Sequence, residues 1–420
     1  MLARSDNRVL LCGALLILMK SQAVCLGDQE GTHTVLHVSA ESIPQEEPRP
    51  DDWPMYGCDA GNTFCNRNEK TLAPPLAEVW EFECPGYVDG VVVSSGILLA
   101  GGSDDHKQEV FALDARNGRH LWTFTLPGGG GGAIGSTPAC CGDLAFFGGQ
   151  NDRNVYAVHL RTGELRWQQG EIKSMFGVSP KVIDGAVYVN SVQSGLWAFD
   201  ANTGKKLWGD EALGRQADIA VIANTLLRPG GAYGGALVAL DTRNGQQCWT
   251  HADGSTSFGM AATEDLVFAT YAGASPVEVP EGDKFKRFTY DRIAAFRTRD
   301  GKKAWETVLK QDALYSGLLV AEDRLYVASR QGSICSLDSG TGELRVDRPF
   351  KEGWGQLIGT SDLIFVSSRD AVLALAPDSL KTRWAISVPG FQHLAAANGK
   401  LYVAAGSKII AFANAKPNDE

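Results

Sequence analysis

Two adjacent cysteines, Cys140 and Cys141, are the residues of this sequence best suited to redox chemistry. A disulfide between neighbouring residues closes a strained ring, and strained disulfides are more easily reduced and more often functional. The pair is therefore a candidate cofactor-binding site. An alternative stays open, because alignment of the repeats described below places the pair where another repeat has Val182 and Ile183. Cys140 is then a core residue and Cys141 its neighbour at a hairpin.

A second set of candidates shares one aligned position near the start of each inner strand. The position holds small or polar residues, which suits the crowded axis of a ring of repeats: Gly90, Thr137, Ser179, Asp218, Gly259, Gly317, Gln356 and His393. The candidates for binding a small ligand or ion at a channel mouth are Thr137, Ser179, Asp218, Gln356 and His393. Hydrated channel residues are the alternative. No Ser-His-Asp or metal-ligand spacing supports catalysis or a metal site.

Cys58 and Cys65 lie close together in the sequence and are the candidates for a local disulfide. Oxidising compartments permit such a bond in an exported protein, and two free thiols are the alternative. Cys84, Cys248 and Cys335 have no evident partner. Buried cysteines often serve only as small hydrophobic residues.

The element that must position these residues is an eleven-residue phrase, ALDARNGRHLW, at residues 112–122. Full copies end at Trp167, Trp208, Trp249 and Trp305, and weaker copies end at Val346 and Trp384. A repeat period near 40 residues indicates a repeat architecture. The Asp and the Asn-Gly or Thr-Gly pair form a tight turn between two strands. The final Trp is predicted to dock against the neighbouring unit and to bury about 150–250 Å² there.

Each phrase follows two further strand-like runs, so one unit is a four-stranded, up-and-down blade. Seven phrases end seven blades, and residues 394–413 supply three strands of an eighth. The missing strand is predicted at residues 78–82, where Trp80 can replace the absent last Trp. The sequence therefore predicts an all-β, eight-bladed propeller over residues 53–416. Closure by the N-terminal strand removes the open edges that would otherwise favour aggregation.

Residues 1–23 have the pattern of a secretory signal peptide. Arg4 and Arg8 precede an apolar run, residues 9–19, that is too short to span a bilayer. An alternative is a lipoprotein signal cleaved before Cys25, although the preceding residues match such a site poorly. We expect an exported protein of the periplasm or extracellular space, associated with a membrane only if Cys25 is lipidated.

Residues 24–52 are rich in Pro, Asp and Glu and poor in large apolar side chains. Such a composition predicts a disordered linker. The chain as a whole has a net charge of −10, which disfavours nucleic acids and anionic membrane surfaces as partners.

One insertion lengthens the fifth blade. Residues 272–291 separate its second and third strands and include a basic, aromatic run: Lys284, Phe285, Lys286, Arg287, Phe288 and Tyr290. Long loops on rigid scaffolds are often functional, so this run is the candidate partner loop. A decorated hairpin with solvated charges is the alternative.

The phrase Ala-x-Asp-x-x-Thr/Asn-Gly-x-x-x-Trp resembles the docking repeat of the pyrroloquinoline quinone (PQQ) propeller superfamily. The resemblance covers roughly residues 53–413. The superfamily includes quinoprotein dehydrogenases, which carry PQQ and calcium at one end of the propeller, and non-catalytic proteins such as BamB. By size and blade lengths the chain resembles the BamB-like members.

The resemblance implies two functions. The first is a non-catalytic, monomeric scaffold that binds a protein or glycan in the cell envelope without a cofactor, or a lipid-anchored assembly factor if Cys25 is acylated. The second is a PQQ- and calcium-dependent oxidoreductase, because alcohol-oxidising quinoproteins carry a vicinal cystine over the cofactor, as Cys140-Cys141 would. The remainder of the quinoprotein site has no clear copy, and no Cys-x-x-Cys-His haem motif occurs. We therefore expect a binding protein in preference to an enzyme.

Overall fold

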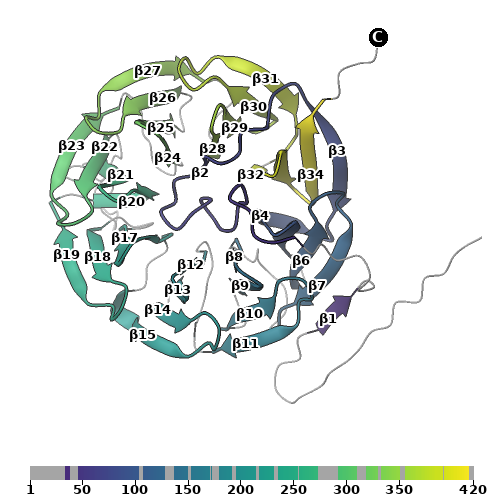
Figure 1. The fold of residues 1–420 in the computed structure, drawn as a ribbon. Coiled ribbons are helices and arrows are strands. Elements are labelled where there is room, and N and C mark those ends of the chain that lie inside the picture. Colours follow the sequence, from purple (N-terminus) through teal and green to yellow (C-terminus); the bar gives the residue numbers. More distant parts are fainter. Residues whose placement is uncertain are drawn as a thin grey trace, which may run out of the picture.

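The chain folds into a closed ring of eight antiparallel blades around a central axis (Figure 1). The computed structural model describes residues 34–37, 46–103, 107–127, 137–149, 153–170, 172, 179–191, 195–213, 217–230, 235–253, 255–272, 292–309, 318–329, 333–350, 355–390 and 392–415. The predicted all-β, eight-bladed propeller is confirmed. Blades 2 to 7 pair their strands in chain order from the axis outwards, whereas blades 1 and 8 each carry an N-terminal strand, β1 (Thr34–His37) or β3 (Leu76–Glu83), at the outer edge.

The first four blades follow one another without a crossover. Blade 1 contains β4 (Tyr87–Ser94), β5 (Ile97–Ser103), β6 (Gln108–Asp114) and β7 (His120–Thr125). Blade 2 contains β8 (Ala139–Cys141), β9 (Leu144–Gly148), β10 (Val155–His159) and β11 (Leu165–Gln169). Blade 3 contains β12 (Lys181–Ile183), β13 (Ala186–Ser191), β14 (Gly195–Asp200) and β15 (Lys206–Asp210), followed by the short helix η2 (Glu211–Leu213). Blade 4 contains β16 (Ala220–Ile222), β17 (Thr225–Arg228), β18 (Leu237–Asp241) and β19 (Gln247–His251).

The last four blades complete the ring. Blade 5 contains β20 (Ser255–Ala262), β21 (Leu266–Ala272), β22 (Arg292–Arg297) and β23 (Lys303–Val308). Blade 6 contains β24 (Leu318–Ala321), β25 (Arg324–Ser329), β26 (Ser333–Asp338) and β27 (Leu344–Pro349). Blade 7 contains β28 (Leu357–Thr360), β29 (Ile364–Ser367), β30 (Ala371–Leu375) and β31 (Thr382–Ser387). Blade 8 contains β32 (Gln392–Ala397), β33 (Lys400–Ala405), β34 (Lys408–Asn414) and β3 (Leu76–Glu83).

The ring is closed by pairing between the two ends of the chain. β3 pairs antiparallel with β34 over Leu76–Glu83 and becomes the outer strand of blade 8. Trp80 then docks on blade 1, where its indole Nε1 donates to Ala115 O at 3.3 Å. The predicted closure by residues 78–82 is therefore confirmed, and so is the role of Trp80.

Docking tryptophans join blades 1 to 6 in succession. At Trp122, Trp167, Trp208, Trp249 and Trp305 the indole Nε1 donates to a turn carbonyl of the following blade at 2.6–3.0 Å. The indole ring lies over the glycine at the seventh position of the eleven-residue phrase in that blade. A Cβ added to this glycine would lie only 2.3–2.8 Å from the indole. The same glycines have positive φ, so both the turn and the packing exclude a side chain. In each blade that carries one of these tryptophans, the Ala that begins the phrase pairs with the Trp. A β-bulge follows directly, between this Ala and the next residue.

The interface between blades 6 and 7 departs from this pattern on both sides. Val346 takes the place of the Trp, and Leu380 takes the place of the glycine with a φ of +54°. The Leu380 side chain is buried, because no indole occupies the space beside it. The turn carbonyl, Pro377 O, instead accepts bonds from Arg324 Nη1 at 3.3 Å and Tyr326 Oη at 3.4 Å.

We expect Val346 and Leu380 to behave as a compensating pair. Val346→Trp alone should lower the free energy of unfolding by about 1–3 kcal/mol, because the indole meets Leu380. Leu380→Gly alone should cost about 1–3 kcal/mol, since the lost burial outweighs the relief of backbone strain. The double variant should be more stable than the sum of the two losses by roughly 0.5–3 kcal/mol. Urea denaturation measures all four proteins, and strictly additive losses would contradict this account.

Two parts of the predicted linker, residues 34–37 and 46–52, are described, and the linker as a whole stays a prediction. Within residues 24–52, β1 (Thr34–His37) pairs antiparallel with β7 and adds a fifth strand to blade 1. Asp52 is buried, where its carboxylate accepts bonds from Ser95 N at 3.0 Å and Asn398 Nδ2 at 2.9 Å. Residues before Trp53 therefore contact blade 1 through strand pairing, and blades 1 and 8 through the buried bonds of Asp52.

The proposed signal peptide, Cys25 and the predicted partner loop with Lys284, Phe285, Lys286, Arg287, Phe288 and Tyr290 lie outside the described residues. In the part of the chain that is described, no helix has the length and hydropathy needed to cross a membrane.

Candidate functional site

One end of the propeller axis is covered by the chain itself. Residues 53–69, here called the axial segment, cross the centre of the ring (Figure 1). Its carbonyls accept bonds at 2.7–2.9 Å from backbone N–H groups of five inner strands: Cys140 to Pro54, Val221 to Ala60, Ala262 to Gly61, Val320 to Thr63 and Gly359 to Phe64. A short strand within it, β2 (Cys65–Asn66), pairs parallel with β28.

The remaining three blades are reached in other ways. Trp53 and Val93 of blade 1 exchange two backbone bonds at 2.8 and 2.9 Å, and Asn66 Nδ2 donates to Ala396 O of blade 8 at 2.8 Å. Lys181 of blade 3 donates to carbonyls of the axial segment. The segment therefore contacts every blade, which satisfies N–H groups that would otherwise be unpaired near the axis.

Lys181 is the most deeply buried charged residue at this end, with 0% of its surface exposed. Its Nζ donates to Tyr56 O and, at 3.2 Å, to Asp59 O. Burial lowers the pKa of Lys181 to about 8, although Asp218 and Asp59 oppose the shift. Burial likewise raises the pKa of Asp218 to about 6, with the Lys181 charge acting against it. The pair anchors the axial segment to blades 3 and 4.

Sequence reasoning did not identify Lys181, although a signal was present. At its aligned position the other inner strands carry apolar residues, such as Ala139, Ala220 and Ala395. A charged residue at such a position indicates a buried polar contact, because an unpaired charge would be too costly there. The partners could not be inferred, since they are backbone carbonyls of a distant segment.

The predicted channel residues form bonds between neighbouring blades. Thr137 N donates to Ser179 Oγ at 3.0 Å, and Ser179 N donates to Asp218 Oδ1 at 2.8 Å. The Gln356 side chain accepts a bond from Leu394 N of the next blade at 2.6 Å. These side chains are thus brought together in sequence around the axis, where they join inner strands. Binding of a ligand by Thr137, Ser179, Asp218, Gln356 and His393 stays a prediction.

Cys140 and Cys141 lie on β8 with different environments. Both are free thiols; Cys140 is buried and Cys141 is exposed. Burial raises the pKa of both thiols, which disfavours the reactive thiolate. Cys140 N donates to Pro54 O at 2.7 Å, so the pair lies beside the axial segment. Its role in binding a cofactor stays a prediction.

Cys58 and Cys65 are both buried, unjoined thiols, and a disulfide between them stays a prediction. The residues from Cys58 to Cys65 form the part of the axial segment that passes around the axis. Cys58 lies close to both Lys181 of blade 3 and Cys65, and Cys65 pairs with Gly359 of blade 7. Burial raises the pKa of Cys65 to about 11.

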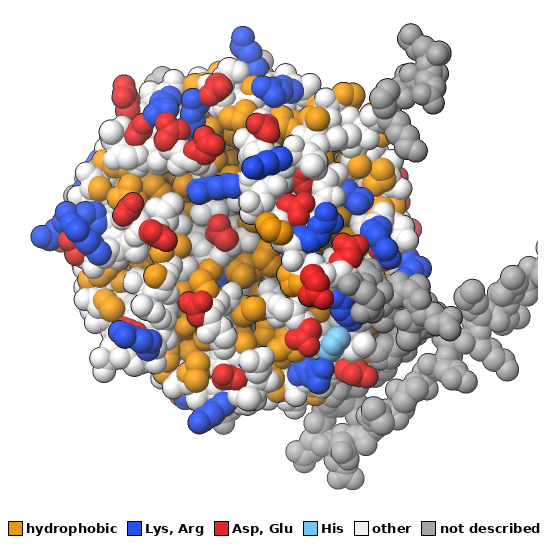
Figure 2. Space-filling model, viewed as in Figure 1, with side chains coloured by type: hydrophobic (Ala, Val, Ile, Leu, Met, Phe, Trp, Pro, Cys, Tyr) orange, Lys and Arg blue, Asp and Glu red, His pale blue; other side chains and the backbone are white. Residues whose placement is uncertain are grey.

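A shallow depression of about 800 Å³ surrounds the axial segment. Its wall includes Arg49, Asp52, Arg67, Glu264 and Cys141. Figure 2 shows that acidic and basic side chains are interspersed with hydrophobic ones on the face in view. No group of three or more His, Cys, Asp and Glu side chains that could hold a metal ion occurs among the described residues. The depression thus combines acidic, basic and apolar side chains in its wall.

Comparison with known proteins matches the chain to the family described as outer membrane protein assembly factor BamB, over residues 106–275 and 289–416. The chain belongs to this family. A BamB of Yersinia pestis is 26% identical over 255 residues, which cover 58% of this chain and 59% of the relative. The crystal structure of BamB from Moraxella catarrhalis matches with a TM-score of 0.64 at 17% identity and covers 83% of this chain and 100% of that structure.

A more distant similarity extends to enzymes with the same repeats. A quinohemoprotein alcohol dehydrogenase of Comamonas testosteroni is 24% identical over 219 residues, 44% of this chain and 30% of the enzyme. The chain thus spans less than two thirds of the length of both curated relatives named here. The predicted membership of the PQQ-like propeller superfamily is confirmed.

We expect Lys181→Met to lower the free energy of unfolding by about 3–5 kcal/mol, because it leaves Asp218 without its buried cation. Adding Asp218→Asn should recover part of the loss. Lys205→Met, at an exposed lysine of the same blade, should change stability little. Thermal and urea unfolding measure these effects. Equal stability of the Lys181 and Lys205 variants would contradict the anchoring role.

His393 generates a pH-dependent prediction. Burial lowers its pKa to about 4, whereas an unfolded histidine titrates near its usual value of 6.5. Between these two values the unfolded chain binds a proton that the folded protein does not, so stability falls as the pH falls. The difference in melting temperature between the natural protein and His393→Gln should therefore shift in favour of the variant from pH 7 to pH 4.5. A constant difference would show that His393 titrates normally.

Proposed function

We propose that this protein is an exported, non-catalytic binding scaffold of the cell envelope, which contacts a protein or glycan partner as an assembly factor. The observation that supports this proposal most directly is the axial segment, which contacts all eight blades at the end that carries Cys140 and Cys141. A rigid ring stabilised in this way presents its loops and outer strands in fixed positions. Membership of the BamB family agrees with such a role.

The scaffold is proposed to act at the outer membrane, where the names of the BamB relatives place their own function. Anchoring would require acylation of Cys25, and soluble export would leave that residue unmodified. Mass spectrometry of the mature N-terminus distinguishes the two. The insertion at residues 272–291 is the proposed partner loop.

The alternative is a PQQ- and calcium-dependent dehydrogenase. The distant similarity to alcohol dehydrogenases supports this alternative. The residues at the axial end fit such a group poorly. Pro54 already contacts the backbone of Cys140, and the adjacent thiols are not joined. No catalytic step is therefore assigned to this chain.

The test is a titration of the mature protein with PQQ and calcium, read as thermal unfolding. Binding to the folded state alone would raise stability by about 2.7 kcal/mol at a hundredfold excess over the dissociation constant. We expect no shift at saturating PQQ. A shift that disappears in Cys140→Ser/Cys141→Ser would overturn the scaffold proposal.

The second arm of this test is crosslinking in intact cell envelopes, followed by identification of the crosslinked proteins. We expect components of the outer-membrane protein assembly machinery, and we expect deletion of residues 275–289 to reduce their yield. Unchanged crosslinking after the deletion would remove the loop from the contact while leaving the scaffold proposal intact.

A further inference from the structure

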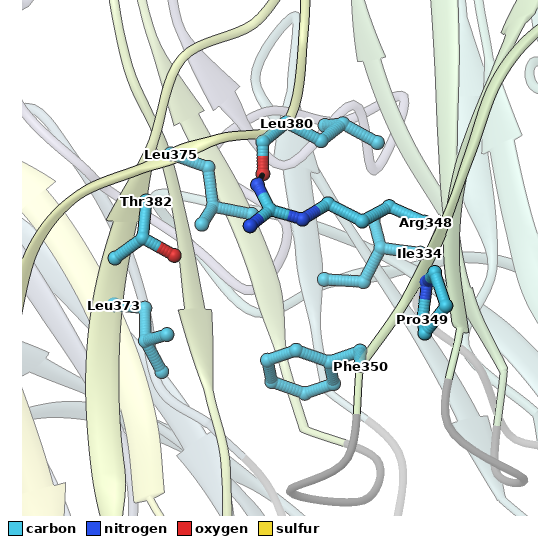
Figure 3. A pocket seen from close by; sticks show the side chains of 8 residues that line it. All are labelled: Ile334, Arg348, Pro349, Phe350, Leu373, Leu375, Leu380 and Thr382. Atoms are coloured by element: carbon cyan, nitrogen blue, oxygen red, sulfur yellow. Dashed lines mark hydrogen bonds between the residues drawn. The ribbon is translucent and has the colours of Figure 1, made fainter.

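A cavity of about 240 Å³ lies between blades 6 and 7, at the interface that lacks a docking Trp (Figure 3). Its wall is mainly apolar, formed by the buried side chains of Ile334, Phe350, Leu373, Leu375 and Leu380. Pro349 and Thr382 also line it and are exposed, so the cavity opens to solvent between the outer strands β27 and β31. By comparison, an apolar cavity of about 150 Å³ is large enough to bind benzene.

Two other interfaces fill the corresponding space with a pair of aromatic rings. Two residues after the docking Trp, blade 1 carries Phe124, whose ring packs on Tyr156 of blade 2 at 5.2 Å between centroids. The closing interface places Phe82 against Phe111 of blade 1 in the same way, at 6.4 Å. At the corresponding positions between blades 6 and 7 stand Arg348 and Leu373. The ring pair of those two interfaces is thus absent here, where a cation and a smaller side chain stand beside a position that also lacks the Trp.

Arg348 does not fill the space that a ring would occupy. Its Nη1 donates to Leu380 O, and Figure 3 shows the side chain reaching from β27 towards that carbonyl along one border of the cavity. A guanidinium at the border of an apolar cavity favours an aromatic ring over an aliphatic group, because a cation is attracted to the face of a π-system. The site therefore combines apolar walls with a cation that is held in place.

We propose that this cavity binds an aromatic side chain, Trp or Phe, of a partner polypeptide, which completes the interface that the chain leaves unfilled. The inference rests on the proposed function as a binding scaffold and names the partner chemistry of one site. Two features favour a polypeptide over a free aromatic molecule. The mouth of the cavity lies between the outer strands β27 and β31. In blade 1 the outer strand β7 pairs with the extended segment β1, so an outer strand of this fold accepts an added strand.

The experiment uses fluorine NMR with the mature protein and two probes: a fluorinated indole, and an acetylated Ala-Trp-Ala amide with the same fluorinated ring. We expect both to bind, and an Ala-Leu-Ala peptide not to compete. Arg348→Phe copies Phe124 and should fill the cavity, which lowers the affinity for both probes by roughly tenfold or more. Leu373→Tyr copies Tyr156 and should also lower the affinity for both probes. This second variant keeps the test informative if Arg348→Phe fails to fold.

Arg383→Phe is the matched control, because it makes the same substitution at an exposed residue outside the cavity wall. It should bind both probes as the natural protein does. Binding that is insensitive to Arg348→Phe and Leu373→Tyr would overturn the proposal, as would an absence of binding. Binding of the indole without the peptide would overturn the polypeptide partner.

The two proposals can fail separately. Crosslinking to the envelope machinery without probe binding would support the scaffold proposal and overturn the cavity proposal. PQQ binding at the axial end would instead overturn the scaffold proposal. It would report on a site separate from the cavity between blades 6 and 7.

Discussion

The contact between a tryptophan and a glycine holds this propeller together. The indole that ends one blade needs a turn without a side chain on the next, and its Nε1 needs a carbonyl from that turn. Both requirements are met by one phrase repeated along the chain. Because the β-bulge recurs beside the residue that pairs with the Trp, each indole leaves its strand at the same place and the interfaces share one geometry. Closure by Trp80 follows the same rule with a strand from the other end of the chain.

The axial segment supplies a second constraint, of a different kind. Blades converge near the axis, where the inner strands leave backbone N–H groups without partners. The carbonyls of residues 53–69 satisfy several of them, and buried Lys181 binds two more carbonyls of the segment. The same arrangement limits function, because the axial end beside Cys140 is occupied by protein. A surface role follows more readily from this geometry than chemistry at the axis.

Departures from the repeat mark the places of greatest functional interest. Val346, Arg348, Leu373 and Leu380 break the packing rule together at a single interface, and the result is an apolar cavity with an open mouth. Their substitutions are mutually consistent, since Leu380 occupies space that an indole would need. Six other interfaces place a Trp against a glycine of the next blade, whereas this one leaves an open cavity.

The sequence by itself determined the fold, because Trp and Gly at a fixed spacing encode local turns and contacts between successive repeats. Eight blades, their order and the closing strand at residues 78–82 could all be read from that spacing. Contacts between distant segments could not. The path of residues 53–69 depends on backbone groups of seven separate inner strands, which leave no pattern in side-chain types. For this reason the anchoring role of Lys181 was missed. The cavity also required the tertiary structure, because a missing Trp in the sequence does not show whether neighbouring side chains collapse into the space or, as here, leave it open.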